Sequence, residues 1–382
     1  MKIQLLNKIA AVGLNQLPDS YTCADTVDAP DGIMVRSAVM HDMEFPTSLK
    51  AIARAGAGVN NIPLDRCSKE GIVVFNTPGA NANGVKELAI CALLLAARDV
   101  VGGIEWAKGL TEDVAKQVEK GKSKFAGTEL SGKTLGVIGL GAIGGLIANA
   151  ALGLGMKVVG CDPFLSVAAA WNLDRRVVHA ATFDEVFAAA DYVTLHVPAT
   201  EQTKNMICTA SIEKMKDGVK ILNLSRADLV NAKELGQALE SGKVSAYVTD
   251  FPTEDVLALP HTVAIPHLGA STEESEDNCA IMAANELADY LENGNIKNSV
   301  NFPAVEMPAS GHTRVCALHS NIPSVLTQIT YALAQEGINI ENMASKSKGD
   351  NAYTILEVSA APSEAALEKI NQIEGMLRVG VI

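Results

Sequence analysis

Through the middle of the chain, short runs of β-branched and apolar residues alternate with stretches of helical apolar spacing. Apolar positions predict helices at 143–154, 183–190 and 232–240, and Thr182 followed by Glu185 predicts a capping box for the second of these helices. The predicted strands, each bounded by Gly, Pro, Asp or Asn, are 134–138, 157–161, 192–197, 219–224, 244–249 and 262–265. This alternation predicts a doubly wound parallel sheet with function at the carboxyl ends of its strands.

The two ends of the chain show different patterns. The first hundred residues predict a second α/β unit, with strands at 32–36, 51–55 and 72–75 and a helix at 85–97. From residue 313 the order becomes strand, helix, strand, strand, helix, strand, which is ferredoxin-like: 314–319, 325–336, 339–348, 352–359, 364–373 and 378–382. The segment 298–311, directly before the C-terminal unit, contains Pro303, Pro308 and Gly311, and this composition predicts a linker.

The fold class is therefore α/β, with two doubly wound parallel-sheet domains, Rossmann-like or flavodoxin-like, and a C-terminal ferredoxin-like βαββαβ domain. Three domains are expected: an N-terminal one at 1–92 with 276–304, a central one at 93–275 and a C-terminal one at 312–382. A length of 382 residues agrees with two or three domains.

Composition and charge argue against several classes of function. Lys and Arg number 31 against 44 Asp and Glu, and this formal charge of −13 argues against general nucleic-acid binding. The longest apolar run, 88–97, ends at Arg98 and is too short to span a bilayer, while Gln4 and Lys8 interrupt the N-terminal apolar run and disfavour a signal peptide. Seven scattered cysteines without a C-x-x-C pair indicate reduced thiols in a cytoplasmic protein without a structural metal.

The clearest local motif is the turn Gly139-Leu-Gly-Ala-Ile-Gly144 between a predicted strand and helix. In such a turn the first glycine allows the tight bend, Gly141 allows the backbone to approach a pyrophosphate, and the last allows the helix to pack on the strand. The next strand ends at Asp162, where a ribose hydroxyl would be bound, and no Arg follows it. The motif therefore indicates NAD over NADP; a purely structural glycine turn is the alternative.

Three polar residues follow three later strands. Arg226, Glu254 and His267 should therefore lie at the same edge of the sheet. A hydride transfer between a hydroxyl and a carbonyl needs an acid-base group near neutral pH, a carboxylate beside it would favour imidazolium, and a guanidinium binds a carboxylate with two bonds. The set predicts a dehydrogenase site.

Taken together these motifs resemble those of the D-isomer-specific 2-hydroxyacid dehydrogenases, and within that family the branch that oxidises 3-phosphoglycerate. The resemblance extends over nearly the whole chain: Val35–Ser37, Arg54–Asn61, Phe75–Pro78, Gly139–Gly144, His196–Pro198, Asn223–Arg226, Asp250–Glu254 and Pro266–Thr272. It implies that Arg226, Glu254 and His267 are the catalytic residues. The implied cofactor-binding residues are Gly139, Gly141, Ala142, Ile143, Gly144, Asp162, His196, Pro198, Thr203, Ser225, Asp250, His267 and Gly269, with Asp250 contacting the nicotinamide amide.

For the substrate, the same resemblance implies two phosphate-binding arginines, a loop for the carboxylate and one further contact: Arg36, Arg54, Ala57, Gly58, Val59 and Asn81. The implied reaction is NAD-dependent oxidation of 3-phospho-D-glycerate to 3-phosphohydroxypyruvate, the first step of phosphorylated serine biosynthesis. Alternatives are a glyoxylate or hydroxypyruvate reductase, a non-catalytic NAD-sensing protein similar to corepressors of this fold, and an amino-acid sensor with an inert catalytic half.

The chain departs from the family pattern at several positions. Ala227 replaces the usual Gly after the catalytic Arg, the stretch from Arg226 to Glu254 is one residue short, and Ala142 stands where an Arg often contacts the pyrophosphate. We expect weaker cofactor binding and a re-aimed Glu254.

The C-terminal unit resembles an ACT domain, a fold that senses amino acids and pairs with its copy in another subunit. The resemblance implies an L-serine site at His319, Asn321 and Asn339 and a homodimer or homotetramer, with Ser324 replacing a usual Gly. A purely structural dimerisation domain is the alternative.

Overall fold

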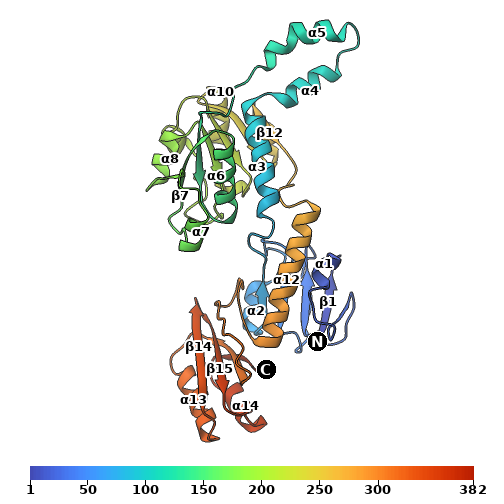
Figure 1. The fold of residues 1–382 in the computed structure, drawn as a ribbon, viewed down its shortest axis with the longest axis vertical. Coiled ribbons are helices and arrows are strands. Elements are labelled where there is room, and N and C mark those ends of the chain that lie inside the picture. The colour runs from blue at the N-terminus through green and yellow to red at the C-terminus, as the bar shows by residue number, and fades with distance from the viewer. The chain divides into compact units, whose positions relative to one another are not determined.

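Three β-sheets organise the chain (Figure 1). The computed structural model describes residues 1–382, which divide into two compact units. Unit 1 consists of Met1–Ala80 and Glu276–Ile382, and unit 2 of Asn81–Ser275. The division into three domains inferred from the sequence stays a prediction.

Unit 2 contains a seven-stranded, all-parallel sheet of order β12-β11-β10-β9-β6-β7-β8. Its strands are β6 (Thr134–Ile138), β7 (Lys157–Cys161), β8 (Val178–His179), β9 (Tyr192–Leu195), β10 (Val219–Asn223), β11 (Val244–Thr249) and β12 (Thr262–Ala264). The strand order reverses between β6 and β9, which makes the carboxyl ends of these two strands the expected ligand site.

Helices cover both faces of this sheet, which confirms the doubly wound prediction. One buried core joins the sheet to α3 (Ala82–Ala97) and α6 (Ala142–Gly153). The other joins it to α8 (Phe183–Ala189), α9 (Thr209–Ile212), α10 (Ala232–Glu240) and α11 (Glu254–Leu257). The short helix α7 (Val167–Trp171) follows β7, and the 3₁₀ turn η2 (Ala227–Leu229) follows β10.

Thr182 caps α8 as predicted. Its hydroxyl accepts the backbone N–H of Glu185 (3.3 Å). The Glu185 carboxylate, however, accepts the N–H of Ala181 (3.0 Å) and not that of Thr182, so the reciprocal bond lies one residue earlier than a capping box requires.

Unit 1 begins with a five-stranded parallel sheet of flavodoxin-like order β2-β1-β3-β4-β5. The strands are β1 (Lys2–Leu6), β2 (Thr22–Ala24), β3 (Gly32–Val35), β4 (Ala51–Arg54) and β5 (Val73–Phe75). The helix α12 (Glu273–Asn293) packs on one face through Ala280, Ala283, Ala284 and Leu287. On the other face lies α2 (Leu64–Lys69), with Cys67 buried, and α1 (Ala11–Leu14) is a single turn.

The C-terminal part of unit 1 is the expected βαββαβ unit. Its elements are β13 (Thr313–Ser320), α13 (Val325–Gln335), β14 (Ile340–Lys348), β15 (Asn351–Val358), α14 (Glu364–Asn371) and β16 (Met376–Val381), and the sheet is antiparallel with order β14-β15-β13-β16. One sheet face carries the two helices. The other contributes Leu318, Tyr353 and Ile355 to the core that contains α12.

The segment 298–311 has no helix or strand, as expected of a linker, but it is not loosely held. Phe302 and Val305 are buried in the core of unit 1, and Asn301 accepts the backbone N–H of Val74 (2.9 Å). Its path is therefore fixed by packing.

An arm extends from unit 2 after α3 (Figure 1). It consists of α4 (Val100–Lys108), α5 (Val114–Gly121) and the 3₁₀ turn η1 (Lys122–Phe125), and no residue of α4 is buried. None of the helices has both the length and the apolar character to traverse a lipid bilayer.

Candidate active site

The glycine turn after β6 has the geometry that dinucleotide binding requires. Gly139 has φ +88°, and a Cβ there would lie 2.5 Å from the carbonyl oxygen of His196. A Cβ on Gly144 would clash with the Gly139 carbonyl, so only glycine lets α6 pack this closely. Around Gly141, the residue before α6, there is open space, and the start of α6 can therefore approach a phosphate.

Asp162 directly follows β7 and is bonded to the turn itself. Its Oδ2 accepts the N–H of Leu140 (2.9 Å) and its Oδ1 accepts the N–H of Phe164 (2.9 Å). These bonds hold the carboxylate at the turn, and each oxygen keeps a further lone pair for a ribose hydroxyl.

His196 follows β9, next to the turn at the switch point of the sheet. Its Nε2 lies 2.8 Å from the Thr194 hydroxyl, while its Nδ1 is buried without a hydrogen-bond partner. Burial lowers the pKa of His196 to about 3, so the imidazole is neutral at physiological pH. A buried, unpaired ring nitrogen at this position is available to a ligand.

Asp250 follows β11 and is 1% exposed. Its Oδ1 is buried without a partner. Burial raises the pKa of Asp250, whereas interactions with His267 and Arg226 and hydrogen bonds from backbone N–H groups oppose that rise. Like His196, Asp250 presents an unsatisfied polar atom at the carboxyl end of a strand, which suits the amide of a nicotinamide.

Other predicted cofactor residues hold the loops around these groups. The Ser225 hydroxyl donates to the Leu195 carbonyl (2.6 Å) and the Thr203 hydroxyl to the Pro198 carbonyl (2.6 Å). Gly269 is buried, and a Cβ there would lie 3.5 Å from Asp250 Oδ2. Ala142 and Ile143 form the first turn of α6.

Arg226, Glu254 and His267 follow β10, β11 and β12, which are neighbours in the parallel sheet. All three side chains are exposed at this edge. The Arg226 guanidinium donates to the Ser225 carbonyl (2.6 Å), and its own carbonyl accepts the buried amide of Asn223 (2.8 Å).

The expected pairing of Glu254 with His267 is not seen. No hydrogen bond or ion pair joins the two residues, and Glu254 is the first residue of α11. Phe251 packs against His267 in its place, with ring centroids 4.6 Å apart and planes tilted by 46°. Phe251 directly follows Asp250 at the strand end, in the stretch that is one residue shorter than the family pattern. Phe251 lies within the motif Asp250–Glu254 but was not among the predicted site residues, and the missing residue directly before it was the signal that could have found it.

The two arginines expected to bind a phosphate end adjacent strands of unit 1. Val35, which precedes Arg36, pairs with Arg54, and Arg54 Nε donates to the Arg36 carbonyl (3.1 Å). Arg36 forms an ion pair with Glu276 (2.6 Å), with both side chains about two-fifths exposed at 41% and 42%. The Arg54 guanidinium lies against Gly56, where any side chain would clash with it.

The loop expected to receive a carboxylate follows β4. Asn76 donates to the Ala57 carbonyl (2.6 Å), and Ile62 donates to the Val59 carbonyl (3.0 Å). Gly58 has open space around it, since a Cβ there would have no neighbouring atom closer than 3.7 Å. Asn81 belongs to unit 2, where it precedes α3 without capping it through its side chain.

The predicted effector residues do not all meet. His319, Asn321 and Ser324 line one cavity of about 410 Å³ in the C-terminal sheet, and Asn339 does not line it. His319 is buried between the Ser320 carbonyl (2.8 Å) and the Thr354 hydroxyl (3.0 Å). Ser324 has φ +71°, the left-handed conformation that favours the glycine it replaces.

Comparison with known proteins agrees with this geometry. Residues 93–269 match the family model described as D-isomer specific 2-hydroxyacid dehydrogenase, NAD binding domain. A D-3-phosphoglycerate dehydrogenase of Escherichia coli (strain K12) is 33% identical over 367 residues, which is 92% of this chain and 86% of that protein. The chain belongs to the D-isomer-specific 2-hydroxyacid dehydrogenases.

Other members of the family differ in length. A D-3-phosphoglycerate dehydrogenase of Archaeoglobus fulgidus is 36% identical over 72% of this chain, which spans only 52% of that protein. Among solved structures, the NAD⁺-bound 3-phosphoglycerate dehydrogenase of Entamoeba histolytica is similar with a TM-score of 0.60 and 27% identity, covering 79% of this chain and 98% of that one. A glyoxylate reductase from Paecilomyes thermophila is similar with a TM-score of 0.64 and 26% identity, covering 78% of this chain and 98% of that one.

NAD fits the residues of this chain. The turn at Gly141 is open, and two buried polar atoms, His196 Nδ1 and Asp250 Oδ1, lack partners at the same edge of the sheet. The NAD-binding domain of the family therefore has its turn, its acidic residue and its unsatisfied polar groups in this chain.

Replacing Asp162 by Ala should relax the preference for NAD over NADP by about tenfold or more, because the lost carboxylate both binds the ribose hydroxyl and repels a 2′-phosphate. The measurement is the ratio of kcat/KM for the two cofactors. Asp174→Asn, at an exposed pair with Arg176 in the same unit, is the control. An unchanged ratio in Asp162→Ala would show that Asp162 does not select NAD over NADP.

Proposed function

We propose that this dehydrogenase oxidises 3-phospho-D-glycerate to 3-phosphohydroxypyruvate with NAD, the entry to phosphorylated serine biosynthesis. The observation that carries the proposal is the placement of Arg226 and His267 after β10 and β12, the two strands on either side of β11, beside the unsatisfied Asp250 that follows β11. The names of the relatives at 31–36% identity agree with it.

In this mechanism neutral His267 accepts the proton of the substrate hydroxyl while the hydride on the same carbon leaves. NAD supplies the hydride acceptor. Arg226 binds the carboxylate with its guanidinium and orients the reacting carbon. Phe251 holds the imidazole plane through ring contact, and the charge formed on His267 is stabilised by Asp250 nearby.

Arg36 and Arg54 are proposed to bind the phosphate, and Ala57, Gly58, Val59 and Asn81 to bind the rest of the substrate. Arginine suits a phosphate because its planar fork donates two bonds at once. Arg36 is already paired with Glu276, so a phosphate would have to displace that carboxylate.

The deciding assay is NADH formation from 3-phospho-D-glycerate and, separately, from unphosphorylated D-glycerate. A strong preference for the phosphate ester is the expected result. Equal use of both would favour a general D-2-hydroxyacid or glyoxylate reductase, and no NADH from any D-2-hydroxy acid would favour a binding protein.

Glu276→Gln should lower the KM for 3-phospho-D-glycerate by about two- to five-fold, because an exposed ion pair is worth at most about 1 kcal/mol and its loss frees Arg36. The KM for D-glycerate should stay the same, since it has no phosphate. A parallel change for both substrates would mean that Arg36 does not contact the phosphate.

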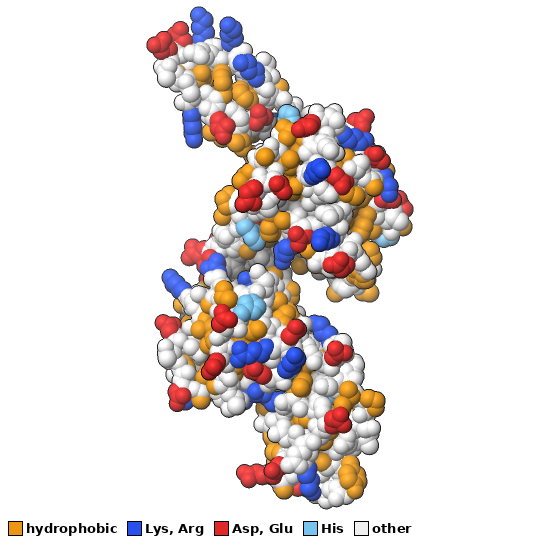
Figure 2. Space-filling model, turned by 180° about the vertical axis from the view of Figure 1, so that it is seen from behind, with side chains coloured by type: hydrophobic (Ala, Val, Ile, Leu, Met, Phe, Trp, Pro, Cys, Tyr) orange, Lys and Arg blue, Asp and Glu red, His pale blue; other side chains and the backbone are white.

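Regulation and assembly are part of the same proposal. The cavity at His319 and Asn321 is proposed to take L-serine as part of an ACT domain. The arm of α4 and α5 exposes Val100, Val101, Ile104 and Val114, and Figure 2 shows its apolar side chains among charged ones at the upper left. We assign this surface to a second copy in a cytoplasmic homodimer or homotetramer. Light scattering tests the assembly, and initial rates measured with and without L-serine test the regulation.

A further inference from the structure

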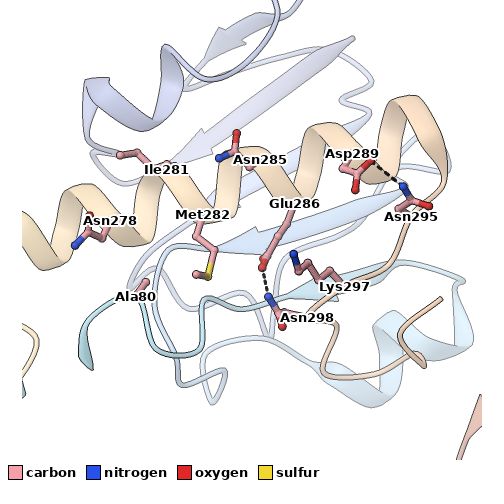
Figure 3. Close-up of a pocket in the computed structure, with 10 residues that line it drawn as sticks. All are labelled: Ala80, Asn278, Ile281, Met282, Asn285, Glu286, Asp289, Asn295, Lys297 and Asn298. Atoms are coloured by element: carbon pink, nitrogen blue, oxygen red, sulfur yellow. Dashed lines mark hydrogen bonds between the residues drawn. The ribbon is translucent and has the colours of Figure 1, made fainter. Parts of the chain in front are cut away.

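A cavity of about 640 Å³ lies in unit 1 beside the middle of α12 (Figure 3). Ala80 and the segment 295–298, which follows the helix, form its other walls. Small-molecule sites typically have volumes of ~300–1,000 Å³. None of the proposed substrate, cofactor or effector residues lines this cavity, so the proposed function does not account for it.

Glu286 is the unusual group of this cavity. The residue is only 7% exposed. Its Oε1 accepts the side-chain amide of Asn298, whereas its Oε2 is buried with no hydrogen-bond partner. Burial raises the pKa of Glu286 to about 7, against the opposing effects of the Asn298 bond and the Lys297 charge. A donor placed on Oε2 would satisfy an otherwise costly buried atom.

Two other charged residues line the cavity, and only one of them has hydrogen-bond partners in the structure. Asp289 accepts the amides of Asn293 (2.8 Å) and Asn295 (3.1 Å) and is satisfied. Lys297 is exposed and forms no ion pair with Glu286, although Figure 3 shows its amino end on the side of that carboxylate. A cation is therefore available to bind an anionic group close to the unpaired oxygen.

The apolar wall lies next to these charges. Met282 and Glu286 are one helical turn apart, and Figure 3 shows both side chains extending from the same side of α12, with Met282 towards Ala80. A ligand that satisfied all three features would carry a donor, an acceptor and an apolar group on a short skeleton. A simple amine would leave Lys297 unused, and a simple carboxylate would leave Oε2 unpaired.

We propose that this cavity binds a free amino acid with an apolar side chain, the ammonium on Glu286 Oε2, the carboxylate on Lys297 and the side chain against Met282 and Ala80. This site is separate from the cavity at His319 and Asn321, with which it shares no lining residue. It does not rest on the proposed oxidation of 3-phospho-D-glycerate.

The test is calorimetric titration of the full-length protein at pH 8 with L-leucine, 3-methylbutylamine and 4-methylpentanoate. Leucine should bind saturably, and each analogue, which lacks one charged group, should bind at least about tenfold more weakly. Glu286→Gln should weaken leucine by about tenfold or more. Glu292→Gln, an exposed residue of the same helix outside the cavity, and Asn321→Ala in the other cavity should leave binding unchanged.

A second measurement uses the unaltered protein and does not depend on how the variants fold. At pH 6 Glu286 is mostly protonated, because its pKa is about 7. Ammonium binding then releases a proton, so the heat should vary with the ionisation enthalpy of the buffer. No saturable leucine binding, binding unaffected by Glu286→Gln, binding lost in Asn321→Ala, or no proton release at pH 6 would each overturn the proposal.

Discussion

Replacing His267 by Asn is expected to lower kcat by about 10²–10⁴-fold, the usual contribution of a general acid-base group. Asn keeps a polar side chain against Phe251 but cannot accept the substrate proton. The affinity for NAD should change little, since the turn at Gly139, Asp162 and the buried oxygen of Asp250 are untouched. Steady-state NADH formation gives kcat, and titration with NAD gives the affinity.

His179→Asn is the matched control. His179 is an exposed residue at the end of β8, in the same unit and at the opposite edge of the sheet from β12. Its replacement should leave both kcat and NAD affinity unchanged. Turnover of His267→Asn within a few-fold of the unaltered protein would show that another group moves the proton, and Glu254 would be the next to replace.

Local pattern was enough to predict most of unit 2. The strands 134–138, 157–161 and 244–249 and the helix 232–240 coincide with β6, β7, β11 and α10. Strands of a parallel sheet are buried on both faces, and their apolar runs therefore stand out between Gly, Pro and Asp. Elements with weaker patterns were missed, including β1, β2 and the arm helices α4 and α5; α4 has no buried residue at all.

The missed helix α12 shows a different limit. It has 21 residues, and its contacts with the sheet are made through small side chains such as Ala280, Ala283 and Ala284. An alanine face contributes little to an apolar pattern, although its small side chains let the helix pack into the core of unit 1. That these alanines form a buried face could be recognised only from the folded structure, in which the sheet packs against them.

For the site, the sequence could place side chains at strand ends but could not say what each one contacts. The edge shared by Arg226, Glu254 and His267 follows from chain order in a parallel sheet. The contact of Phe251 with His267 and the pair of Arg36 with Glu276 are non-local, the latter joining residues 240 positions apart in the sequence. Such contacts depend on how the elements pack, which no local motif encodes.

The most buried ion pair of the chain should dominate the stability of the C-terminal sheet. Arg314 and Glu357 lie opposite each other on β13 and β15, with side chains 5% and 1% exposed and 2.8 Å apart. Arg314 also donates to the carbonyls of Asn293 (2.7 Å), Met307 (2.9 Å) and Pro308 (2.6 Å). One guanidinium thus connects the sheet to the end of α12 and to the segment that joins them.

Arg314→Met should therefore lower the free energy of unfolding of this sheet by about 3–5 kcal/mol, since it leaves a buried carboxylate and buried carbonyls without their partner. Amide exchange should accelerate in peptides from β13 and β15 by about 10²–10⁴-fold. Trp106 and Trp171 both lie in unit 2, so their fluorescence unfolding transition serves as an internal control and should not move. The double variant Arg314→Met, Glu357→Leu should be more stable than the single one, because it removes the orphaned charge.

The pH dependence gives an independent check of the same pair. Although burial opposes it, hydrogen bonds from Asn342, Arg314 and Ser310 lower the pKa of Glu357 from 4.5 to about 2. The folded sheet therefore binds fewer protons than the unfolded one in this range, and the stabilisation is complete above pH 4.5 and is lost as the pH falls from 4.5 towards 2. In Arg314→Met, burial should dominate and raise the pKa of Glu357 above 4.5, so protection of β13 and β15 should increase as the pH falls towards 4.5 and should not be lost below it. The same acid-induced loss of protection in both proteins would show that Glu357 is not held by Arg314.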